Sequence, residues 1–218
     1  MKGRTPPGFD LRPCELDVVA SLVGEHHGYG SMGASATYTF AVYEEGKPVA
    51  AYSWQPPPVG AAKSVCPEAH GGVLALSRMV AVPRAERRLR HVSKPLRAQM
   101  RQLIDRGRWP VLVTYSDEGQ GHTGHVYKCS GWEKTTRRTV PFFLNAEGKR
   151  ASSYSNGKYG SRELTRGGTT TIQRWEHRAC PRGEAATWME ELGWRRVALP
   201  GRVWKSGNQA HRWIKCTG

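Results

Sequence analysis

The stretch from Val113 to Trp132 holds the densest group of side chains that could carry out chemistry. It reads Val-Thr-Tyr-Ser-Asp-Glu-Gly-Gln-Gly-His-Thr-Gly-His-Val-Tyr-Lys-Cys-Ser-Gly-Trp, so an apolar, β-type run ends on Asp117. Ligands bind at the strand ends of α/β folds, and the glycines that follow let the backbone approach a ligand closely. The imidazole of His122 can move a proton near neutral pH. Asp117, His122 and Tyr127 are therefore candidate catalytic residues.

A second apolar run, from Val73 to Val82, is interrupted at its middle by Ser77 and Arg78. Such a run suits a central strand, and a polar break in a buried strand favours a functional role. Ser77 joins the candidate catalytic residues, whereas Arg78 could bind the donor or substrate or pair internally with Asp117. The candidate substrate- and donor-binding residues are Arg78, Tyr115, Ser116 and Gly121.

Structural roles compete with each of these interpretations. An Asp after a strand commonly caps a helix or forms a turn, and a tyrosine in a short helix usually packs. His125 is an alternative to His122 as a proton shuttle. Cys129 has no evident base partner, so packing is its favoured role. Cys66 and His70 have the spacing of half a metal site, but no second half accompanies them.

The charge balance points to a polyanionic partner. The 218 residues include 33 Lys and Arg against 18 Asp and Glu, which gives a net charge of +15, and the pI is near 10.0. With 8 Trp and 8 Tyr the chain is too aromatic for a disordered polycation. A folded basic protein that binds nucleic acid is the first expectation.

The basic residues are concentrated in two runs that flank Asp117. Residues 84–108 carry nine basic side chains against two acidic ones, and residues 134–166 carry eight against two. Aromatic residues lie within the second run, which is typical of sites that combine phosphate contacts with base stacking. We expect double-stranded DNA as the partner, contacted by Arg84, Arg87, Arg88, Arg137, Arg138, Lys149, Arg150 and Lys158.

Other features of the sequence concern the location of the protein, the state of its cysteines and its oligomeric state. No stretch reaches the roughly 18 consecutive apolar residues of a membrane span, and the polar start has no secretory signal, so we expect a cytoplasmic protein with no membrane partner. Five cysteines at wide, irregular spacing are unlike a disulfide framework and are expected to be thiols. The oligomeric state is not fixed by the sequence, and a dimer is one option.

Periodicity and turn signals predict the secondary structure. An apolar stripe that starts after Ser93 and is closed by Gly107 predicts a helix with Ser93 as its N-cap. The runs Tyr38–Tyr43 and Val49–Trp54 predict a β-hairpin, and residues 55–72 are predicted to be a loop. Further helices are predicted over 11–23, 122–128 and 184–192, and strands over 73–82, 111–115, from 132, 194–199 and 210–215. The middle of the chain thus has the order β-β-β-α-β-α-β.

Three segments are expected along the chain. Residues 1–144 form the catalytic core. Residues 145–172, rich in Ser, Thr, Gly and basic residues, form a basic flap or DNA-contacting loop. Residues 173–218 form a folded appendage that completes or extends the core, because five tryptophans are costly to leave exposed.

The run around Asp117 resembles the Mom-type DNA-modification proteins of Mu-like bacteriophages. Their pattern is a strand ending in an aromatic, a small residue and Asp, then a Gly-His-x-Gly-x-x-Tyr element and a Gly/Asn-Trp, which here end on Tyr127 and Trp132. The segment His26-His27-Gly28-Tyr29 resembles the family's His-Tyr element, and Leu76-Ser-Arg-Met-Val80 its Leu-x-Arg strand. The resemblance covers roughly residues 20–165, about two thirds of the chain.

The resemblance implies an α/β (α+β) fold of the GNAT acyltransferase type. This fold is a mixed, splayed β-sheet flanked by helices, here with a small C-terminal α/β appendage, and the order β-β-β-α-β-α-β agrees with it. In working GNAT enzymes a Gly-rich loop holds the diphosphate of coenzyme A with backbone N–H groups. Residues 83–96 contain no glycine, which counts against acyl-CoA as the cofactor. Arg87, Arg88 and Lys94 could hold phosphates through their side chains instead.

The resemblance also implies an activity. It is the transfer of a small acyl or carbamoylmethyl-type group from a small-molecule donor to an exocyclic base amine, adenine N6 in the family, which protects DNA from restriction. It further implies an iron ion held by a His, a Tyr and an Asp, here His27, Tyr29 and Asp117, with His26 as the alternative to His27. The competing functions are an acetyl-CoA-dependent N-acetyltransferase acting on hypermodified phage DNA and a non-catalytic DNA-binding relative.

Overall fold

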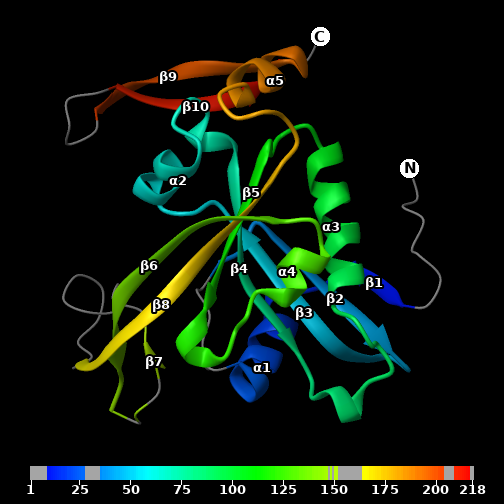
Figure 1. The fold of residues 1–218 in the computed structure, drawn as a ribbon. Coiled ribbons are helices and arrows are strands. Elements are labelled where there is room, and N and C mark those ends of the chain that lie inside the picture. Colours follow the sequence, from blue (N-terminus) through cyan, green and yellow to red (C-terminus); the bar gives the residue numbers. More distant parts are fainter. Residues whose placement is uncertain are drawn as a thin grey trace.

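The computed structural model describes residues 9–27, 35–146, 148, 150–151, 164–203 and 209–216. Figure 1 shows how the elements are arranged. The helices are α1 (Leu16–His26), α2 (Val59–Val65), α3 (Ser93–Asp105), α4 (His125–Cys129) and α5 (Ala185–Glu191), with 3₁₀ turns η1 (His70–Gly72), η2 (Arg84–Glu86) and η3 (Glu118–Gln120). The strands are β1 (Asp10–Pro13), β2 (Tyr38–Glu44), β3 (Lys47–Gln55), β4 (Val73–Ala81), β5 (Val111–Asp117), β6 (Glu133–Leu144), β7 (Arg150–Ala151), β8 (Thr165–Arg178), β9 (Trp194–Val203) and β10 (Gln209–Lys215).

An eight-stranded sheet forms the centre of the fold. Its strands lie in the order β1-β2-β3-β4-β5-β8-β6-β7, and β9 and β10 form a separate two-stranded sheet. Neighbouring strands are antiparallel except β4 and β5, which are parallel. That parallel pairing covers only Val73–Ala75 and Val111–Val113. Beyond these residues the two halves of the sheet diverge, as Figure 1 shows below the label β5.

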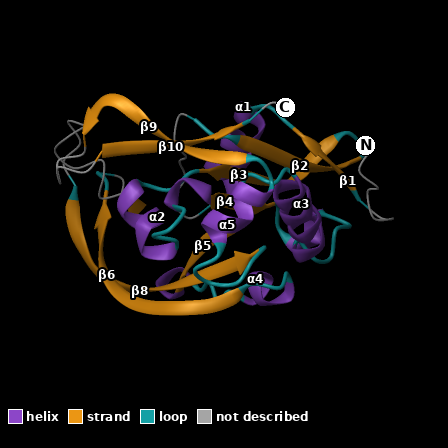
Figure 2. Cartoon of the chain, turned by 90° about the horizontal axis from the view of Figure 1, so that it is seen from above, coloured by secondary structure: helices purple, strands orange, loops and turns teal. Residues whose placement is uncertain are grey.

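Different helices cover the two faces of the sheet. Side chains alternate along β3, so Tyr52 packs in the core beneath α3 whereas Ala51 packs against α1 on the other face. Helix α3 buries Leu96, Met100 and Leu103, at offsets of four and seven residues, which is the apolar stripe of an amphipathic helix. Figure 2 shows α1 and α4 on opposite sides of the sheet.

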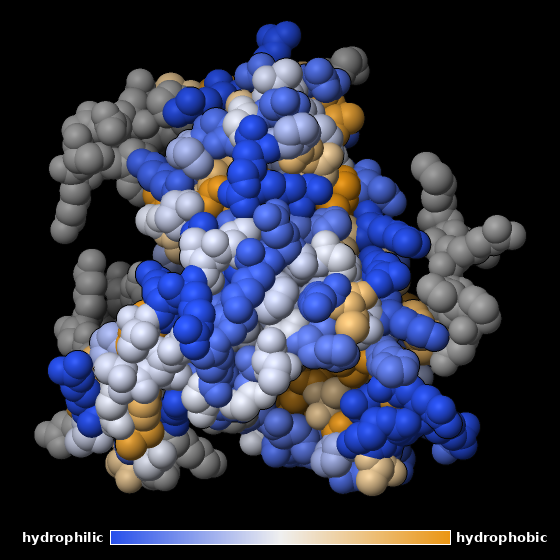
Figure 3. All heavy atoms as spheres, in the orientation of Figure 1, coloured by the Kyte–Doolittle hydropathy of each residue, from blue (hydrophilic) through white to orange (hydrophobic). Residues whose placement is uncertain are grey.

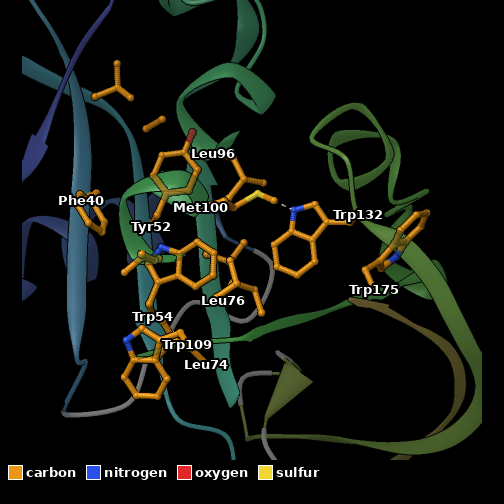
Figure 4. Close-up of a cluster of buried hydrophobic side chains, with 14 of the residues drawn as sticks. Phe40, Tyr52, Trp54, Leu74, Leu76, Leu96, Met100, Trp109, Trp132 and Trp175 are labelled. Carbon is orange, nitrogen blue, oxygen red and sulfur yellow. Dashed lines mark hydrogen bonds between the residues drawn. The ribbon is translucent and has the colours of Figure 1, made fainter. Parts of the chain in front are cut away.

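Large aromatic side chains fill the core at the point where the two halves of the sheet separate. Trp54 and Trp132 stack with their ring centroids 6.3 Å apart, and the Trp132 Nε1 lies 3.0 Å from the Met100 Sδ (Figure 4). The Trp175 Nε1 donates to Ser116 Oγ at 2.9 Å. Because buried indole N–H groups need partners, these contacts fix the orientation of the Trp132 and Trp175 rings beside β5.

A buried carboxylate joins β8 to its neighbours. Glu176 is 1% exposed and accepts hydrogen bonds from Arg178 Nη2 at 2.8 Å and Thr135 Oγ1 at 3.0 Å, while Arg174 Nε lies 3.0 Å away. The Arg178 Nη2 also donates to the carbonyl of Val65, at the end of α2, at 2.6 Å. A carboxylate tolerates burial only when it is paired and hydrogen-bonded, so this network ties β6, β8 and α2 together.

Most of the predicted elements are confirmed. The hairpin is β2 and β3, the two polar residues interrupt β4, and the predicted C-terminal helix and strands are α5, β9 and β10. The order β-β-β-α-β-α-β holds from β2 to β6 apart from the added α2. The five cysteines are free thiols, as predicted. Among the described residues, no helix is long and apolar enough to span a membrane.

Two predictions in the first third of the chain are wrong. Residues 11–13 belong to β1, which pairs with Phe40–Tyr43, so helix α1 begins only at Leu16. Pairing with a sheet edge here outweighs the local helical pattern. Residues 55–72 contain α2 and η1 instead of a continuous loop, because Ala62 and Val65 bury their side chains against the sheet. Ser93 is the first residue of α3, whose N-cap is Val92.

The predicted basic flap over residues 145–172 is corrected in its last eight residues, while residues 152–163 of it lie outside the described part of the chain. Residues 165–172 form the first half of β8, which pairs with β5 on one side and with β6 on the other. The boundary expected between residues 172 and 173 therefore falls inside a strand of the central sheet. Residues 165–169 are exposed on both faces, so the alternation of apolar and polar side chains that marks a half-buried strand is absent there.

Glu176→Gln is expected to destabilise the protein. The substitution leaves two arginines buried without a counter-charge, which costs about 3 kcal/mol and lowers the melting temperature by roughly 6–12 °C. Glu133→Gln, at an exposed carboxylate 3.9 Å from Arg182, is the matched control and should change the melting temperature little. Thermal unfolding followed by circular dichroism makes the comparison; equal melting temperatures for the two variants would contradict a structural role for the Glu176 network.

Candidate active site

The candidate site lies where β4 and β5 separate. The register of β4 against β3 jumps from the pair Arg78–Ser53 to the pair Leu76–Trp54, so Ser77 forms a β-bulge. Just past the last paired residues, Thr114 Oγ1 of β5 donates to the Leu76 carbonyl of β4 at 3.1 Å. From here the backbones of β4 and β5 do not form ladder hydrogen bonds with each other, and other side chains can reach between them.

Tyr127 reaches this separation point from α4. Burial raises the pKa of the Tyr127 hydroxyl, against a smaller lowering from the side chain of Thr114, so the hydroxyl stays protonated at neutral pH. The ring is held between Trp132 and Trp175, with centroid distances of 5.9 Å to each. Gly124 allows α4 to start here, because at its φ of +73° an added Cβ would lie 2.2 Å from the Trp175 ring. The hydroxyl of Tyr127 is thus fixed in position.

Three donors hold the carboxylate of Asp117 at the end of β5. Gly119 N donates to Oδ1 at 3.0 Å, the Thr170 hydroxyl donates to the same oxygen, and the guanidinium of Arg150 pairs with Oδ2. The side chains of Arg150 and Asp117 are only 10% and 8% exposed. An added Cβ at Gly119 would lie 2.4 Å from Thr170 Oγ1 and 2.8 Å from Arg150 Nη2. The Asp117 carboxylate is therefore fixed in one orientation.

Arg150 brings the edge strand β7 over this carboxylate. Its guanidinium lies 4.1 Å from the centroid of the Phe142 ring on β6, a cation–π contact, while it pairs with Asp117. The guanidinium paired with Asp117 is thus that of Arg150, not that of Arg78 as one sequence interpretation suggested. Arg78 Nη1 donates to the carbonyl of Ser77 at 2.7 Å.

Two histidines from distant segments meet beside this loop. The rings of His27, at the end of α1, and His122, after η3, have centroids 6.5 Å apart. The His122 N–H donates to the Asp117 carbonyl at 3.1 Å, which fixes the loop. Burial lowers the pKa of His27 to about 4, with further lowering from Arg78 and His122. His27 is therefore a neutral imidazole at pH 7, the form that accepts a proton.

The other predicted catalytic and binding residues lie in different settings. Ser77 Oγ donates to the Ser53 carbonyl at 3.0 Å, on the side of β4 away from β5. Ser116 is buried beneath the Trp175 indole, whereas Tyr115 is 36% exposed. Gly121 adopts a φ of +72° with nothing within 4 Å of an added Cβ. Ser77 and Ser116 thus make contacts within the sheet and core, and Tyr115 and Gly121 reach the surface.

The arginines predicted to contact DNA from the loop after β4 also make contacts within the chain. Arg87 is half-buried and donates from Nε to the Val82 carbonyl at 3.0 Å, and Arg84 Nη1 donates to the Arg87 carbonyl at 3.1 Å. Arg88 pairs with Glu45 on the exposed surface. Arg84 and Arg88 keep exposed side chains, so the geometry leaves them as surface cations with local partners.

The β6–β8 ribbon carries the other described basic candidates. Arg137 is exposed and pairs with Glu118 at 2.8 Å, and its hydrogen bond together with one from Gln173 lowers the pKa of Glu118 to about 2. Arg138 is exposed on the same strand, next to Lys134 and Arg137 in the exposed part of the ribbon. Figure 3 shows a largely hydrophilic to neutral face over β6 and β8. Lys149 and Lys158 lie outside the described residues.

The predicted iron ligands are His27, Tyr29 and Asp117. Tyr29 lies outside the described residues, and among the described ones no three His, Cys, Asp or Glu side chains gather as a metal would require. The Asp117 carboxylate accepts a guanidinium, a hydroxyl and a backbone N–H. A cation would have to displace the guanidinium, so Asp117 as placed does not fit an iron ligand. Iron binding stays a prediction, and the reaction proposed for this site does not depend on it.

The sequence interpretation missed two residues of the site. Thr114 interrupts an apolar strand in the same way as Ser77 does, so the same signal would have found it. Thr170 had no comparable signal, because it lies 53 residues from Asp117 in a polar Thr-rich segment. The pairing of Arg150 with Asp117 was likewise hidden, because it depends on β7 returning along β6.

The low pKa of His27 predicts how stability depends on pH. The folded-state pKa of about 4 lies below the ordinary value of 6.5, so below pH 6.5 the unfolded chain takes up a proton that the folded chain does not. The free energy of unfolding should therefore fall as the pH drops from 6.5 to 4, and His27→Asn should make that fall shallower. Urea unfolding at several pH values and NMR titration of the imidazoles measure both. Titration of His27 near 6.5 would contradict the burial described.

Comparison with solved structures identifies the fold. The chain is similar to the ribosomal-protein-S18-alanine N-acetyltransferase from Escherichia coli, with a TM-score of 0.50 at 14% identity, over 81% of this chain and 97% of that one. It is also similar to a candidate phosphinothricin N-acetyltransferase, with a TM-score of 0.51 at 12% identity, over 80% of this chain and all (100%) of that one. At these identities the likeness concerns the fold, and it confirms the predicted GNAT-type splayed sheet.

Comparison with sequence families identifies the relatives of the chain. No curated protein sequence matches it. A family model described as the Mom protein family matches residues 9–190, which include both halves of the splayed sheet and the loop that follows Asp117. The chain therefore belongs to the Mom protein family, is built on the GNAT acyltransferase fold and, by family and fold together, is a transferase.

Proposed function

We propose that this transferase modifies a base of double-stranded DNA, transferring a small acyl or carbamoylmethyl-type group to an exocyclic amine, with adenine N6 as the expected acceptor and protection from restriction as the outcome. One observation carries the proposal. In a chain of the Mom protein family, the hydroxyl of Tyr127, the pair His27–His122 and the fixed carboxylate of Asp117 are held by the elements around the separation of β4 and β5.

The reaction requires a proton acceptor. As the amine nitrogen bonds the transferred carbon, the bond from that carbon to the leaving group breaks with its electrons going to the leaving group, and the nitrogen gives up a proton. His122 supplies the imidazole for that proton, because the low pKa of its neighbour His27 makes His27 the weaker base. The backbone N–H of His122 donates to the backbone carbonyl of Asp117, which holds His122 beside it. Asp117, whose carboxylate accepts from Gly119, Thr170 and Arg150 among the described residues, then acts as a positioning residue for this loop.

The leaving group requires a proton or a hydrogen bond as it departs. The Tyr127 hydroxyl lies near Thr114, at the separation of the strands, and is protonated at neutral pH. A protonated phenol can donate a hydrogen bond or a proton to an anionic leaving group. Tyr127 is therefore our candidate acid, and Ser77, whose hydroxyl is directed to β3, is assigned no chemical role.

The net charge of +15 supports a DNA substrate. The exposed Lys134 and Arg138 lie on β6, next to the strand that supplies Thr170 to the Asp117 carboxylate. A target base must leave the helical stack to reach side chains such as Tyr127, so contacts to the DNA backbone near the site would hold the strand during that step.

An acetyl-CoA-dependent N-acetyltransferase is the second candidate function. The fold likeness to N-acetyltransferases favours it. The two functions predict different added masses on the base and different donors. A non-catalytic DNA-binding relative would leave the DNA unmodified.

The modification itself is tested by mass spectrometry of nucleosides. Plasmid DNA from cells that express the wild-type protein should contain deoxyadenosine with an added mass, and an acetyl mass would favour the second candidate. Tyr127→Phe should reduce the modified fraction by about 100-fold, as loss of a general acid does. Asp117→Asn should reduce it as well, because the Arg150 pair is lost.

Glu118→Gln is the matched control, because Glu118 is the next carboxylate along the chain and pairs with Arg137 at the surface. It should leave the modified fraction unchanged. Unmodified DNA from the wild type, recovered while the protein still binds DNA, would refute the proposal and identify a DNA-binding relative.

DNA contact by the β6–β8 ribbon is tested through salt dependence. Arg138→Ala should lower the slope of log K against log salt by about 1, the effect of losing one phosphate contact. Arg12→Ala removes the same charge from β1, at the opposite edge of the sheet, and should leave the slope unchanged. Fluorescence anisotropy with a duplex oligonucleotide at several salt concentrations gives the slopes; equal slopes for Arg138→Ala and the wild type would place the DNA elsewhere.

A further inference from the structure

The loop between β4 and α3, residues 82–92, is the segment in which this fold could hold a diphosphate. An anion is held by such a loop when several backbone N–H groups point to one place beside a helix N-terminus. The partners of the loop N–H groups therefore decide whether a diphosphate can bind here. Two of these groups donate to the side chain of Glu44.

Glu44 lies at the end of β2, next to the β2–β3 turn, and its carboxylate binds two consecutive amides of the loop. Oε2 accepts from the Arg88 N–H at 2.7 Å and Oε1 accepts from the Leu89 N–H at 2.6 Å. Leu89 is 6% exposed and packs in the main core, so the loop is anchored on both sides of this contact. One carboxylate thus occupies two convergent donors of the kind that a phosphate would need.

Other polar groups of the loop also have partners within the chain. Arg87 donates from Nε to the Val82 carbonyl at 3.0 Å and from its guanidinium to the Leu89 carbonyl. The Tyr52 hydroxyl, buried beneath the loop, donates to the Val92 carbonyl at 3.0 Å. Pro95 contributes no N–H to the first turn of α3. These internal contacts hold the loop in place.

The negative charge of Glu44 also disfavours a diphosphate at this loop. Binding a diphosphate at the Arg88 and Leu89 amides would place it against the carboxylate of Glu44, with Glu45 next to it in the chain. Like charges that compete for the same donors exclude each other. The side chain of Arg88 already pairs with Glu45.

We infer that Glu44 takes the anion position of the β4–α3 loop, so that this chain does not hold the diphosphate of a coenzyme A thioester there. This inference rests on the proposed group transfer only in naming the donor class: the donor carries no diphosphate to this loop. The contact between Glu44 and the loop itself is independent of that function.

The first experiment measures ligand binding by calorimetry. Coenzyme A and adenosine 3′,5′-bisphosphate are titrated into the wild-type protein and into Lys94→Ala. We expect no saturable binding to the wild type at ligand concentrations up to about 1 mM. Saturable binding of coenzyme A to the wild type that Lys94→Ala weakens would overturn the inference.

The second experiment measures amide hydrogen exchange by NMR. The amides of Arg88 and Leu89 should be protected in the wild type and should exchange at least about tenfold faster in Glu44→Gln. Glu45→Gln is the matched control, because Glu45 contacts only the exposed side chain of Arg88 among the described contacts, and it should leave both amides protected. Unprotected amides in the wild type, or equal exchange in Glu44→Gln and the wild type, would overturn the role of Glu44.

Both readouts are separate from catalysis. DNA that stays unmodified would refute the proposed function while the exchange rates still reported on Glu44. Binding of coenzyme A to a protein that modifies DNA would overturn this inference and leave the proposed function intact.

Discussion

The separation of β4 from β5 is the constraint on which the rest of the structure depends. The two strands share only three residue pairs before they diverge, and β5 pairs along its whole length with β8 instead. Trp132 and Trp175 support Tyr127 at this point, and the bulge at Ser77 turns β4 away. Because two neighbouring parallel strands stop pairing inside a sheet, side chains from both halves can be brought to one place without breaking the core.

Buried or half-buried carboxylates organise much of the remaining chain. Glu176 joins β8 to α2, Asp117 joins β5 to β7 and β8, and Glu44 joins β2 to the loop before α3. Each is satisfied by arginine, hydroxyl or backbone donors, which is the condition for burying such a group. Some of the 33 basic side chains therefore neutralise internal acids, and the others remain to meet a polyanion.

Only the structure shows which basic residues of the two runs are internal and which are exposed. Residues 84–108 and 134–166 are similar basic runs, and each contains both internal and exposed cations. Arg87 binds loop carbonyls and Arg150 pairs with Asp117, whereas Arg88 and Arg138 stay exposed. The internal cations lie beside carbonyl or carboxylate oxygens, which need donors once they are buried.

The sequence by itself determined the order of most elements, the hairpin, the amphipathic α3 and the strand that ends on Asp117, because these follow from periods of two or 3.6 residues and from turn residues. It also led to the Mom resemblance. Tertiary structure alone decided that β8 belongs to the sheet, that Arg150 and Thr170 bind Asp117, and that Glu44 closes the loop before α3. These contacts join residues 33 to 53 positions apart, and no local pattern encodes which distant donor will satisfy a buried carboxylate.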